Sequence, residues 1–421
     1  MKVLFIIDRI NYYRIIAPLI QEFLSSGHSV DCAHDYSKPM SKRRLDECRL
    51  EWTPIFDQDK NFHPFSFIDN HELFRKIEND GYDYVFTISL SHAQEAYVKS
   101  MQFCKWVCIP PFSDDWILML VDVDTLDSID YFLLQSEYWL ERNVRFLKEL
   151  FGWFGEEEEN KFRSKAKCLG WIQGDQTARV DKERTYCELG IPPDKKVVLW
   201  FNFSVDVTRF SWKQQLFTYN STSERIKYIL KNCRNPIKAW VSFFEVHIGD
   251  LLNMVREYCW DNNACLVMKY RNRDKILTVE REKCDYFFND IAYYPSINNK
   301  LLAITDLCVS PFSLAARDAA AEGIPSIVHD FHHIMDATYY EMKTPMYKSY
   351  EEEYGYMNFP NLIDFTRCKE EFRELLFSRD LKSRSVPESS VRDYTNTFIG
   401  EYGVSASERM VSYLADQLAK Y

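Results

Sequence analysis

Residues 305–328 read TDLCVSPFSLAARDAAAEGIPSIV, and this stretch decides the fold. Its apolar residues 307–309 predict a buried strand, and 310–312 predict a turn. Ser313 is the expected N-cap of a helix that stops at Gly323, and residues 326–329 predict a second strand. A strand, a helix and another strand in this order are typical of an α/β domain with a parallel sheet.

The predicted helix 313–322 also carries the residues of a phosphate site. Its first N–H groups have no partner within the helix, and together with the helix dipole they favour an anion. Ser310 and Ser313 would add hydroxyl donors, and Asp318 would accept hydrogen bonds from ribose hydroxyls. We therefore expect a nucleotide here; the alternative is a capped, alanine-rich core helix with one tolerated aspartate.

Length and composition limit the class of protein. With 421 residues, of which 46% are hydrophobic, the chain is expected to form two domains with sizeable cores. A net charge of −11 argues against a nucleic-acid partner. The 12 cysteines include no C-x-x-C pair, which favours free thiols in a reducing cytoplasm. No apolar run approaches the roughly 18 residues of a membrane span, and no glycine-rich dinucleotide or P-loop motif occurs.

Strand-like and helix-like segments alternate in two series, the second of which starts at residue 196. This alternation predicts two doubly wound, Rossmann-like α/β domains facing a cleft, with ligands at the carboxyl ends of the strands. Residues 156–165 are expected to be a solvated charged loop, and 361–377 and 406–420 to be helices. The expected divisions are a first domain at 1–173, a linker at 174–195, a second domain at 196–385 and a C-terminal helical segment at 386–421.

The 305–328 stretch resembles the nucleotide-binding segment of GT-B glycosyltransferases. Its serine-rich version is nearest to the CDP-glycerol transferases and the Kdo- or sialyl-transferases of bacterial surface-polysaccharide synthesis. The opening segment, MKVLFIIDRINYYRIIAPLIQEFLSSGHSVDCA, is similar to the start of the same fold. The resemblance implies a metal-independent enzyme without a cofactor, which takes a nucleotide-sugar donor and a glycan or lipid-linked acceptor. The residues in register with the family's pattern are Asp306, Ser310, Ser313, Asp318, Gly323 and Pro325.

Further donor contacts follow from the resemblance. Lys269 ends an expected strand and is a candidate phosphate contact, while Tyr293 and Tyr294 lie in the loop that would hold the base. Ser204 and Arg209 belong to the loop after the first strand of the second domain, which could close over the phosphates. The alternatives are a solvated lysine, surface tyrosines and an ordinary long loop.

The catalytic base of this architecture usually comes from the first domain. Asp8 directly follows the first expected strand. Asp114 and Asp115 follow the strand expected at 105–110, where one carboxylate could raise the pKa of its neighbour. Asn11 and Arg14 are candidates to orient the acceptor. Each carboxylate could instead be an ordinary cap or loop residue.

Two departures from the family pattern leave the activity open. Retaining enzymes often carry two glutamates where this chain has Ser310 and Asp318, and the His-Pro of cytidylate-using relatives does not follow Lys269. We therefore consider three hypotheses for the function. One is a glycosyltransferase of surface-polysaccharide synthesis, cytoplasmic or peripheral to the inner membrane and able to join an assembly complex. The others are a nucleotide-sugar 2-epimerase and a catalytically silent scaffold.

Two acidic or histidine-rich segments are not expected to bind a metal. The Asp122-Val123-Asp124 triplet lies in an acidic run and is expected to be a solvated loop. His329 ends the strand expected at 326–329 and His332 follows it; their spacing fits no common metal motif, so a contact with substrate is favoured for them.

Overall fold

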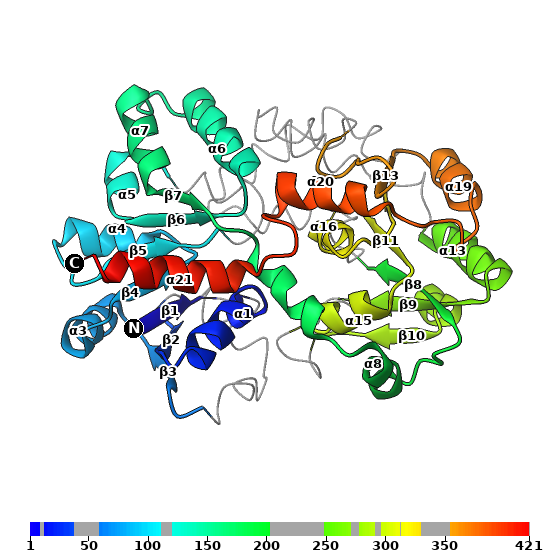
Figure 1. Ribbon diagram of the computed structural model, residues 1–421, viewed down its shortest axis with the longest axis horizontal. Coiled ribbons are helices and arrows are strands. Elements are labelled where there is room, and N and C mark those ends of the chain that lie inside the picture. The colour runs from blue at the N-terminus through cyan, green and yellow to red at the C-terminus, as the bar shows by residue number, and fades with distance from the viewer. Residues whose placement is uncertain are drawn as a thin grey trace, which may run out of the picture. The chain divides into compact units, whose positions relative to one another are not determined.

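The chain forms two α/β units, each built on a parallel sheet (Figure 1). The first unit comprises Met1–Val180, Ile291–Asn299 and Arg392–Tyr421, and the second comprises Asp181–Asp290 and Lys300–Val391. The chain therefore returns to the first unit at its C-terminal end. The computed structural model describes residues 1–8, 12–37, 59–110, 120–202, 248–270, 278–290, 296–311, 313–329 and 354–420.

The first unit is built on a seven-stranded sheet of order β3-β2-β1-β4-β5-β6-β7. Every neighbouring pair is parallel. The central strands are buried along their length, as expected where helices cover both faces of a sheet. The strand order reverses between β1 and β4, which is where such sheets bind ligands. The strands are β1 Lys2–Ile7, β2 Ser29–Asp35, β3 Phe62–Phe67, β4 Tyr84–Thr87, β5 Lys105–Cys108, β6 Tyr131–Leu134 and β7 Ala166–Cys168.

The last helix of the chain belongs to the core of the first unit. Helix α21 packs beside α1 although the two lie at opposite ends of the sequence (Figure 1). The hydroxyl of Tyr84 on β4 donates to the Leu414 carbonyl of α21 at 2.8 Å. The helices of this unit are α1 Tyr12–Ser25, α3 Asn70–Asp80, α4 Ser91–Val98, α5 Val123–Asp127, α6 Glu137–Leu150, α7 Glu156–Lys165, the 3-10 helix η2 Ile172–Arg179 and α21 Ala406–Leu418. Helix α20 Glu388–Phe398 precedes α21 and contains the boundary between the two units.

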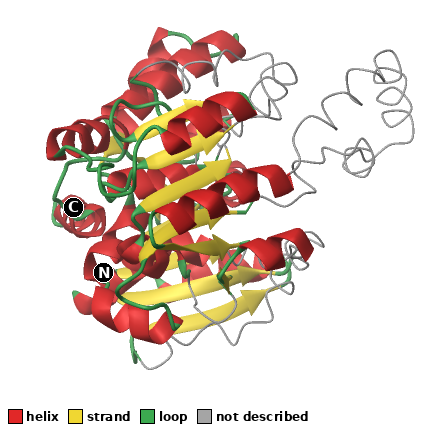
Figure 2. Cartoon of the chain, turned by 90° about the vertical axis from the view of Figure 1, so that its right-hand side faces the viewer, coloured by secondary structure: helices red, strands yellow, loops and turns green. Residues whose placement is uncertain are grey.

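The second unit is built on a six-stranded parallel sheet of order β10-β9-β8-β11-β12-β13. Helices α13 and α19 cover one face around the buried Trp200 and Tyr258. Figure 2 shows the strands lying side by side among the helices. The strands are β8 Lys196–Phe201, β9 Ala264–Lys269, β10 Tyr286–Phe288, β11 Leu307–Pro311, β12 Ser326–His329 and β13 Ile363–Thr366; the helices are α8 Lys182–Leu189, α13 Ile248–Asp261, α14 Thr278–Lys283, α15 Asn298–Ile304, α16 Leu314–Ala321 and α19 Lys369–Phe377.

The predicted fold class, two doubly wound α/β domains, is confirmed, while several local predictions are wrong. The charged segment expected to be a loop is helix α7. Four glutamates occupy its first turn and two basic residues its last, an order that complements the helix dipole. Arg163 also bonds Glu159 one turn earlier, at 2.9 Å. Because charges rather than an apolar stripe stabilise this helix, hydrophobic periodicity did not reveal it.

The segment 361–377, expected to be one helix, is a strand followed by a shorter helix. Ile363–Thr366 forms β13 and pairs with β12, and helix α19 starts only at Lys369. Strand β3 was not predicted, whereas helix α20 lies within the C-terminal helical segment expected at 386–421. The Asp122-Val123-Asp124 triplet is not a loop either, because Asp122 caps α5 by accepting from the Thr125 N–H at 2.8 Å.

No helix in the described part of the chain is both long and apolar enough to cross a bilayer. The described cysteines are free thiols, and most of them are buried.

Two glycines let the C-terminal return pass close to the first sheet. Gly400 follows α20 with a φ of +145°, and a Cβ there would lie 2.6 Å from the Cα of Gly170. Gly170 itself has a φ of +106°, and its added Cβ would lie 2.8 Å from the Cβ of Ala406. Any side chain at either position would push backbone segments apart, so both positions require glycine.

We predict that Gly400→Ala strongly destabilises the first unit. The matched control is Gly27→Ala, because Gly27 also has a positive φ of +77° but has open space where its Cβ would be. The control should lose about 1 kcal/mol for the left-handed backbone alone. Gly400→Ala should lose about 2 kcal/mol more because of the backbone clash. Thermal unfolding measures both, and equal losses would contradict the close crossing.

Candidate functional site

The carboxyl edge of the second sheet contains the helix predicted to bind phosphate. Ser313 is the N-cap of α16, with extended backbone and a hydroxyl that accepts from the Ala315 N–H at 3.3 Å. The prediction of this cap is confirmed. The strand, however, continues through Pro311, so Ser310 lies in β11 and not in a turn. Ser310 is fully buried, and its hydroxyl donates to the Pro311 carbonyl at 2.6 Å.

Asp318 lies on α16 and accepts hydrogen bonds from Arg317, the residue before it. The guanidinium of Arg317 donates to Asp318 Oδ1 from Nε at 3.0 Å and from Nη2 at 2.7 Å. Arg317 is almost completely buried, whereas the Asp318 side chain keeps 13% of its surface exposed. The arginine neutralises and orients this carboxylate. A ribose contact at Asp318 remains a prediction.

Lys269 is the last residue of β9, as predicted, and it is not a solvated side chain. Its Nζ lies 2.9 Å from Asp290 Oδ2, with the lysine side chain 6% and the aspartate side chain 18% exposed. A buried charge needs a partner, and Asp290 serves as that partner here. A phosphate contact by Lys269 would therefore have to share the lysine with Asp290.

Two further polar residues lie at this edge: Asn202, which begins the loop predicted to close over the phosphates, and Glu280, which was not predicted. Asn202 directly follows β8, and its backbone N–H donates to the Lys269 carbonyl at 2.8 Å. Its side-chain Nδ2 donates to Glu280 Oε1 on α14 at 2.8 Å, and both side chains are buried. The Asn202 Oδ1 atom has no hydrogen-bond partner among the described residues.

His329 ends β12 at the same edge and is buried in an aromatic environment. Its ring centroid lies 5.6 Å from that of Trp200 and 6.0 Å from that of Phe372. These contacts place the imidazole within the packing of the sheet. Among the described residues, no group of three or more metal-ligating side chains comes together.

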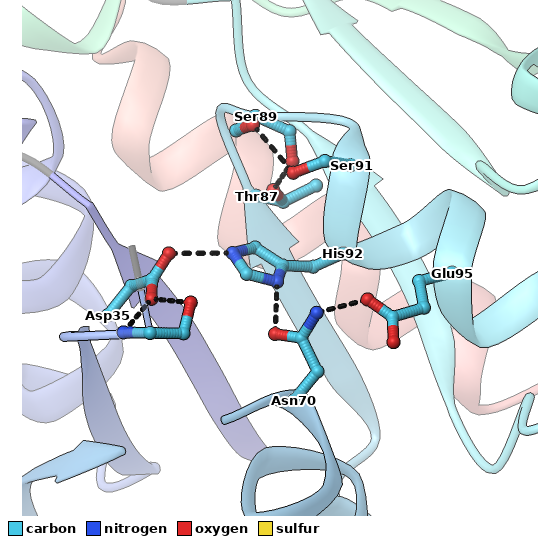
Figure 3. A network of polar contacts seen from close by, with 8 residues as sticks. Asp35, Asn70, Thr87, Ser89, Ser91, His92 and Glu95 are labelled. Atoms are coloured by element: carbon cyan, nitrogen blue, oxygen red, sulfur yellow. Dashed lines mark hydrogen bonds and ion pairs between the residues drawn. The ribbon is translucent and has the colours of Figure 1, made fainter. Parts of the chain in front are cut away.

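The carboxyl edge of the first sheet carries a second polar network, which was not predicted (Figure 3). His92, in the first turn of α4, lies between Asp35 at the end of β2 and Asn70 at the start of α3. Its Nε2 is 3.2 Å from Asp35 Oδ2, and its Nδ1 is 3.1 Å from Asn70 Oδ1. Asn70 Nδ2 in turn donates to Glu95. The network joins three segments that are far apart in the sequence.

A serine-bearing turn adjoins this network at the carboxyl end of β4. The Thr87 hydroxyl donates to the Ser89 carbonyl, and the hydroxyls of Ser89 and Ser91 lie 3.1 Å apart. Ser91 is exposed and Ser89 is half-buried. The turn lies on the β4 side of the strand-order reversal, opposite Asp8, which follows β1.

The remaining predicted site residues are only partly covered by the structure. Asp8 is half-buried directly after β1, as expected, and Arg14 is half-buried on α1. The residues that lie outside the described part of the chain are Asn11, Asp114, Asp115, Ser204, Arg209, Tyr293, Tyr294 and His332.

We predict that Lys269→Met destabilises the second unit by about 3 kcal/mol or more, because it removes the buried cation that is paired with the half-buried Asp290. The double variant Lys269→Met/Asp290→Leu should recover most of this loss. Lys196→Met is the control, since Lys196 pairs with Asp306 at 2.7 Å but is 51% exposed; it should change stability by less than about 1 kcal/mol. Urea unfolding tests this. Equal losses for the two lysine variants would contradict a structural role for the Lys269–Asp290 pair.

Comparisons with known proteins support the fold and nothing finer. No family model and no curated protein matches the chain. The UDP-GlcNAc 2-epimerase of Methanocaldococcus jannaschii matches with a TM-score of 0.54 at 12% identity, over 99% of this chain and 100% of that one. The wall teichoic acid polymerase TagF matches with a TM-score of 0.54 at 9% identity, over 100% of this chain and 89% of that one. The chain thus has the GT-B-like fold of two Rossmann domains that these proteins share.

Proposed function

We propose that the protein is a glycosyltransferase that takes a sugar from a nucleotide-activated donor and passes it to a glycan acceptor in surface-polysaccharide synthesis. The observation that carries the proposal is the position of Ser313 and the start of α16. They follow β11 directly, beside the point where the strand order of the second sheet reverses between β8 and β11. In doubly wound sheets this is the place where nucleotides bind.

The chemistry of this edge suits a nucleoside phosphate. The first N–H groups of α16 and its dipole favour an anion. Lys269 adds a positive charge at the end of β9. This strand pairs with β8, which Asn202 directly follows. The buried Asn202 Oδ1 would accept a hydrogen bond from the ligand, because it has no partner among the described residues. Asp318 is proposed to bind the ribose.

The transfer step needs a leaving nucleotide and an activated acceptor hydroxyl. Negative charge develops on the phosphate as the sugar leaves, and the start of α16 with Lys269 would stabilise it. Asp8 is our first candidate for the base that takes the acceptor proton, since it follows β1 where the strand order of the first sheet reverses. Asp114 and Asp115 are kept as candidate bases and Asn11 and Arg14 as acceptor contacts; Ser204, Arg209, Tyr293 and Tyr294 are kept as donor contacts.

A nucleotide-sugar 2-epimerase is the second candidate. One observation favours it: the match covers all of the M. jannaschii epimerase chain, whereas 89% of the TagF chain is covered. The two activities differ in a simple way. An epimerase would interconvert a nucleotide-sugar without any acceptor, and a transferase would leave the donor intact until an acceptor is added. Following the donor alone by proton NMR separates them.

We predict that a UDP-, GDP-, CDP- or CMP-linked sugar raises the melting temperature of the protein. A ligand present at about 100 times its Kd adds about 2.7 kcal/mol to stability, which is several degrees for a domain of this size. Ser313→Ala and Asp318→Asn should each reduce this ligand-induced shift by at least half. Differential scanning fluorimetry with and without the donor measures the effect.

The control for that experiment is Ser405→Ala. Ser405 caps α21 in the first unit through a 3.3 Å bond from the Glu408 N–H, so it matches Ser313 in chemistry. Both serine variants should lose about 1 kcal/mol of stability as lost caps. Only Ser313→Ala should also weaken the ligand-induced shift. If no donor stabilises the protein, or if both serine variants respond equally, the proposed site is wrong.

A further inference from the structure

Asn202 is a buried amide that one hydrogen bond holds in a fixed orientation. Its side chain is 6% exposed, and its Nδ2 donates to Glu280 Oε1 on α14 at 2.8 Å. Since the NH2 group is held by the carboxylate, the Oδ1 atom is turned away from it. This oxygen is buried and has no hydrogen-bond partner among the described residues. The unused position at Asn202 is therefore an acceptor, which a hydrogen-bond donor would satisfy.

The backbone of Asn202 is fixed as well. Its N–H donates to the Lys269 carbonyl at 2.8 Å, which continues the pairing of β8 with β9 beyond the last paired residues of the two strands. The side chain therefore starts from a well-anchored part of the sheet. A residue held in this way can select a ligand group by its position, because neither its backbone nor its amide has to be ordered when the ligand binds.

A phosphate group does not match this acceptor. The phosphates that link a nucleoside to a sugar carry no proton at neutral pH, so their oxygens only accept hydrogen bonds. The N–H groups at the start of α16 and the Ser313 hydroxyl are donors that suit them. A hydroxyl or an N–H group, in contrast, is the complement of the Asn202 oxygen. The two positions thus match two different parts of a nucleotide-sugar.

The order of the strands indicates which part of the donor reaches Asn202. β8 pairs directly with β11, and neighbouring strands lie about 4.8 Å apart. Asn202 is therefore one strand away from the phosphate site proposed at the start of α16, while the base loop predicted after β10 is three strands away from it. A transferred sugar is bonded directly to the phosphate, whereas the ribose, which we assign to Asp318, separates the base from it. The sugar hydroxyls are then the donors nearest to Asn202.

We propose that Asn202 accepts a hydrogen bond from a hydroxyl group of the transferred sugar and so distinguishes the complete donor from the free nucleotide. Glu280 acts by holding the Asn202 amide and is a positioning residue. This inference rests on the proposed function, because it needs a nucleotide at the start of α16. It adds the part of the substrate that the Asn202–Glu280 pair recognises, which is a hydroxyl-bearing group and not a phosphate.

Asn202→Ala tests the contact by comparing two ligands on the full-length protein. UDP-, GDP-, CDP- and CMP-linked sugars are each titrated calorimetrically beside the matching free nucleotide. Loss of one hydrogen bond should raise the Kd of the bound donor about tenfold. The Kd of its free nucleotide should rise less than about twofold, because that ligand lacks the hydroxyl. Equal weakening of both ligands, as a purely structural role would cause, or an unchanged donor Kd would overturn the proposal.

Asn143→Ala is the matched control. Asn143 lies within α6 of the first unit, its side chain is buried, and its Oδ1 also lacks a hydrogen-bond partner in the described part of the chain. It does not lie at the end of a strand, so its loss should change neither Kd. A weakening of donor binding in Asn143→Ala as large as that in Asn202→Ala would count against a contact at Asn202.

The exchange Asn202→Asp/Glu280→Gln keeps the test independent of the stability of the single variant. It reverses the pair, so that the new amide donates to the new carboxylate, whose second oxygen remains an acceptor. The ratio of the two Kd values should return toward that of the unaltered protein, and a ratio that stays as in Asn202→Ala would refute the acceptor role. If neither a donor nor a free nucleotide binds the unaltered protein, the proposed function fails and this inference fails with it. If both bind and the ratio does not depend on Asn202, the inference alone is wrong.

Discussion

Parallel strands place all their carboxyl ends at one edge, and the rest of this structure depends on that constraint. In each sheet the strand order reverses once, beside β1 in the first unit and beside β8 in the second. The reversal splays the connecting loops apart and leaves the strand ends open to a ligand. Polar side chains that would be costly inside a sheet therefore gather at these ends.

The two edges are organised differently. In the second unit the polar groups are a capped helix start, the Lys269–Asp290 pair and the Asn202–Glu280 pair, which together offer donors, positive charge and an acceptor. In the first unit a single ring, His92, joins three segments through charged and amide partners (Figure 3). The second edge suits an anionic ligand, while the first edge is held together by the hydrogen bonds of a buried histidine.

The sequence predicted the parts of the fold that local patterns encode. The strand, cap and helix from 307 to 321 were predicted because apolar runs, Ser313 and small residues act locally. Helix α7 was missed because its stability comes from paired charges, and β13 because its pairing with β12 overrides a helix-like pattern. For the site, Lys269 was located correctly at its strand end, but its pairing with Asp290 could not be known from sequence. Asp35, Asn70 and His92 come from three distant segments, and only the folded sheet brings them together.

The central claim is that a nucleotide-linked sugar binds at the carboxyl edge of the second sheet. Hydrogen exchange of the full chain, measured with and without a donor that binds, tests it most directly. We expect protection of the amides at 313–316 in the first turn of α16 and at 200–202 at the end of β8. The amino ends of the same strands should show no comparable protection. A donor that binds but leaves the 313–316 amides unchanged would contradict the account.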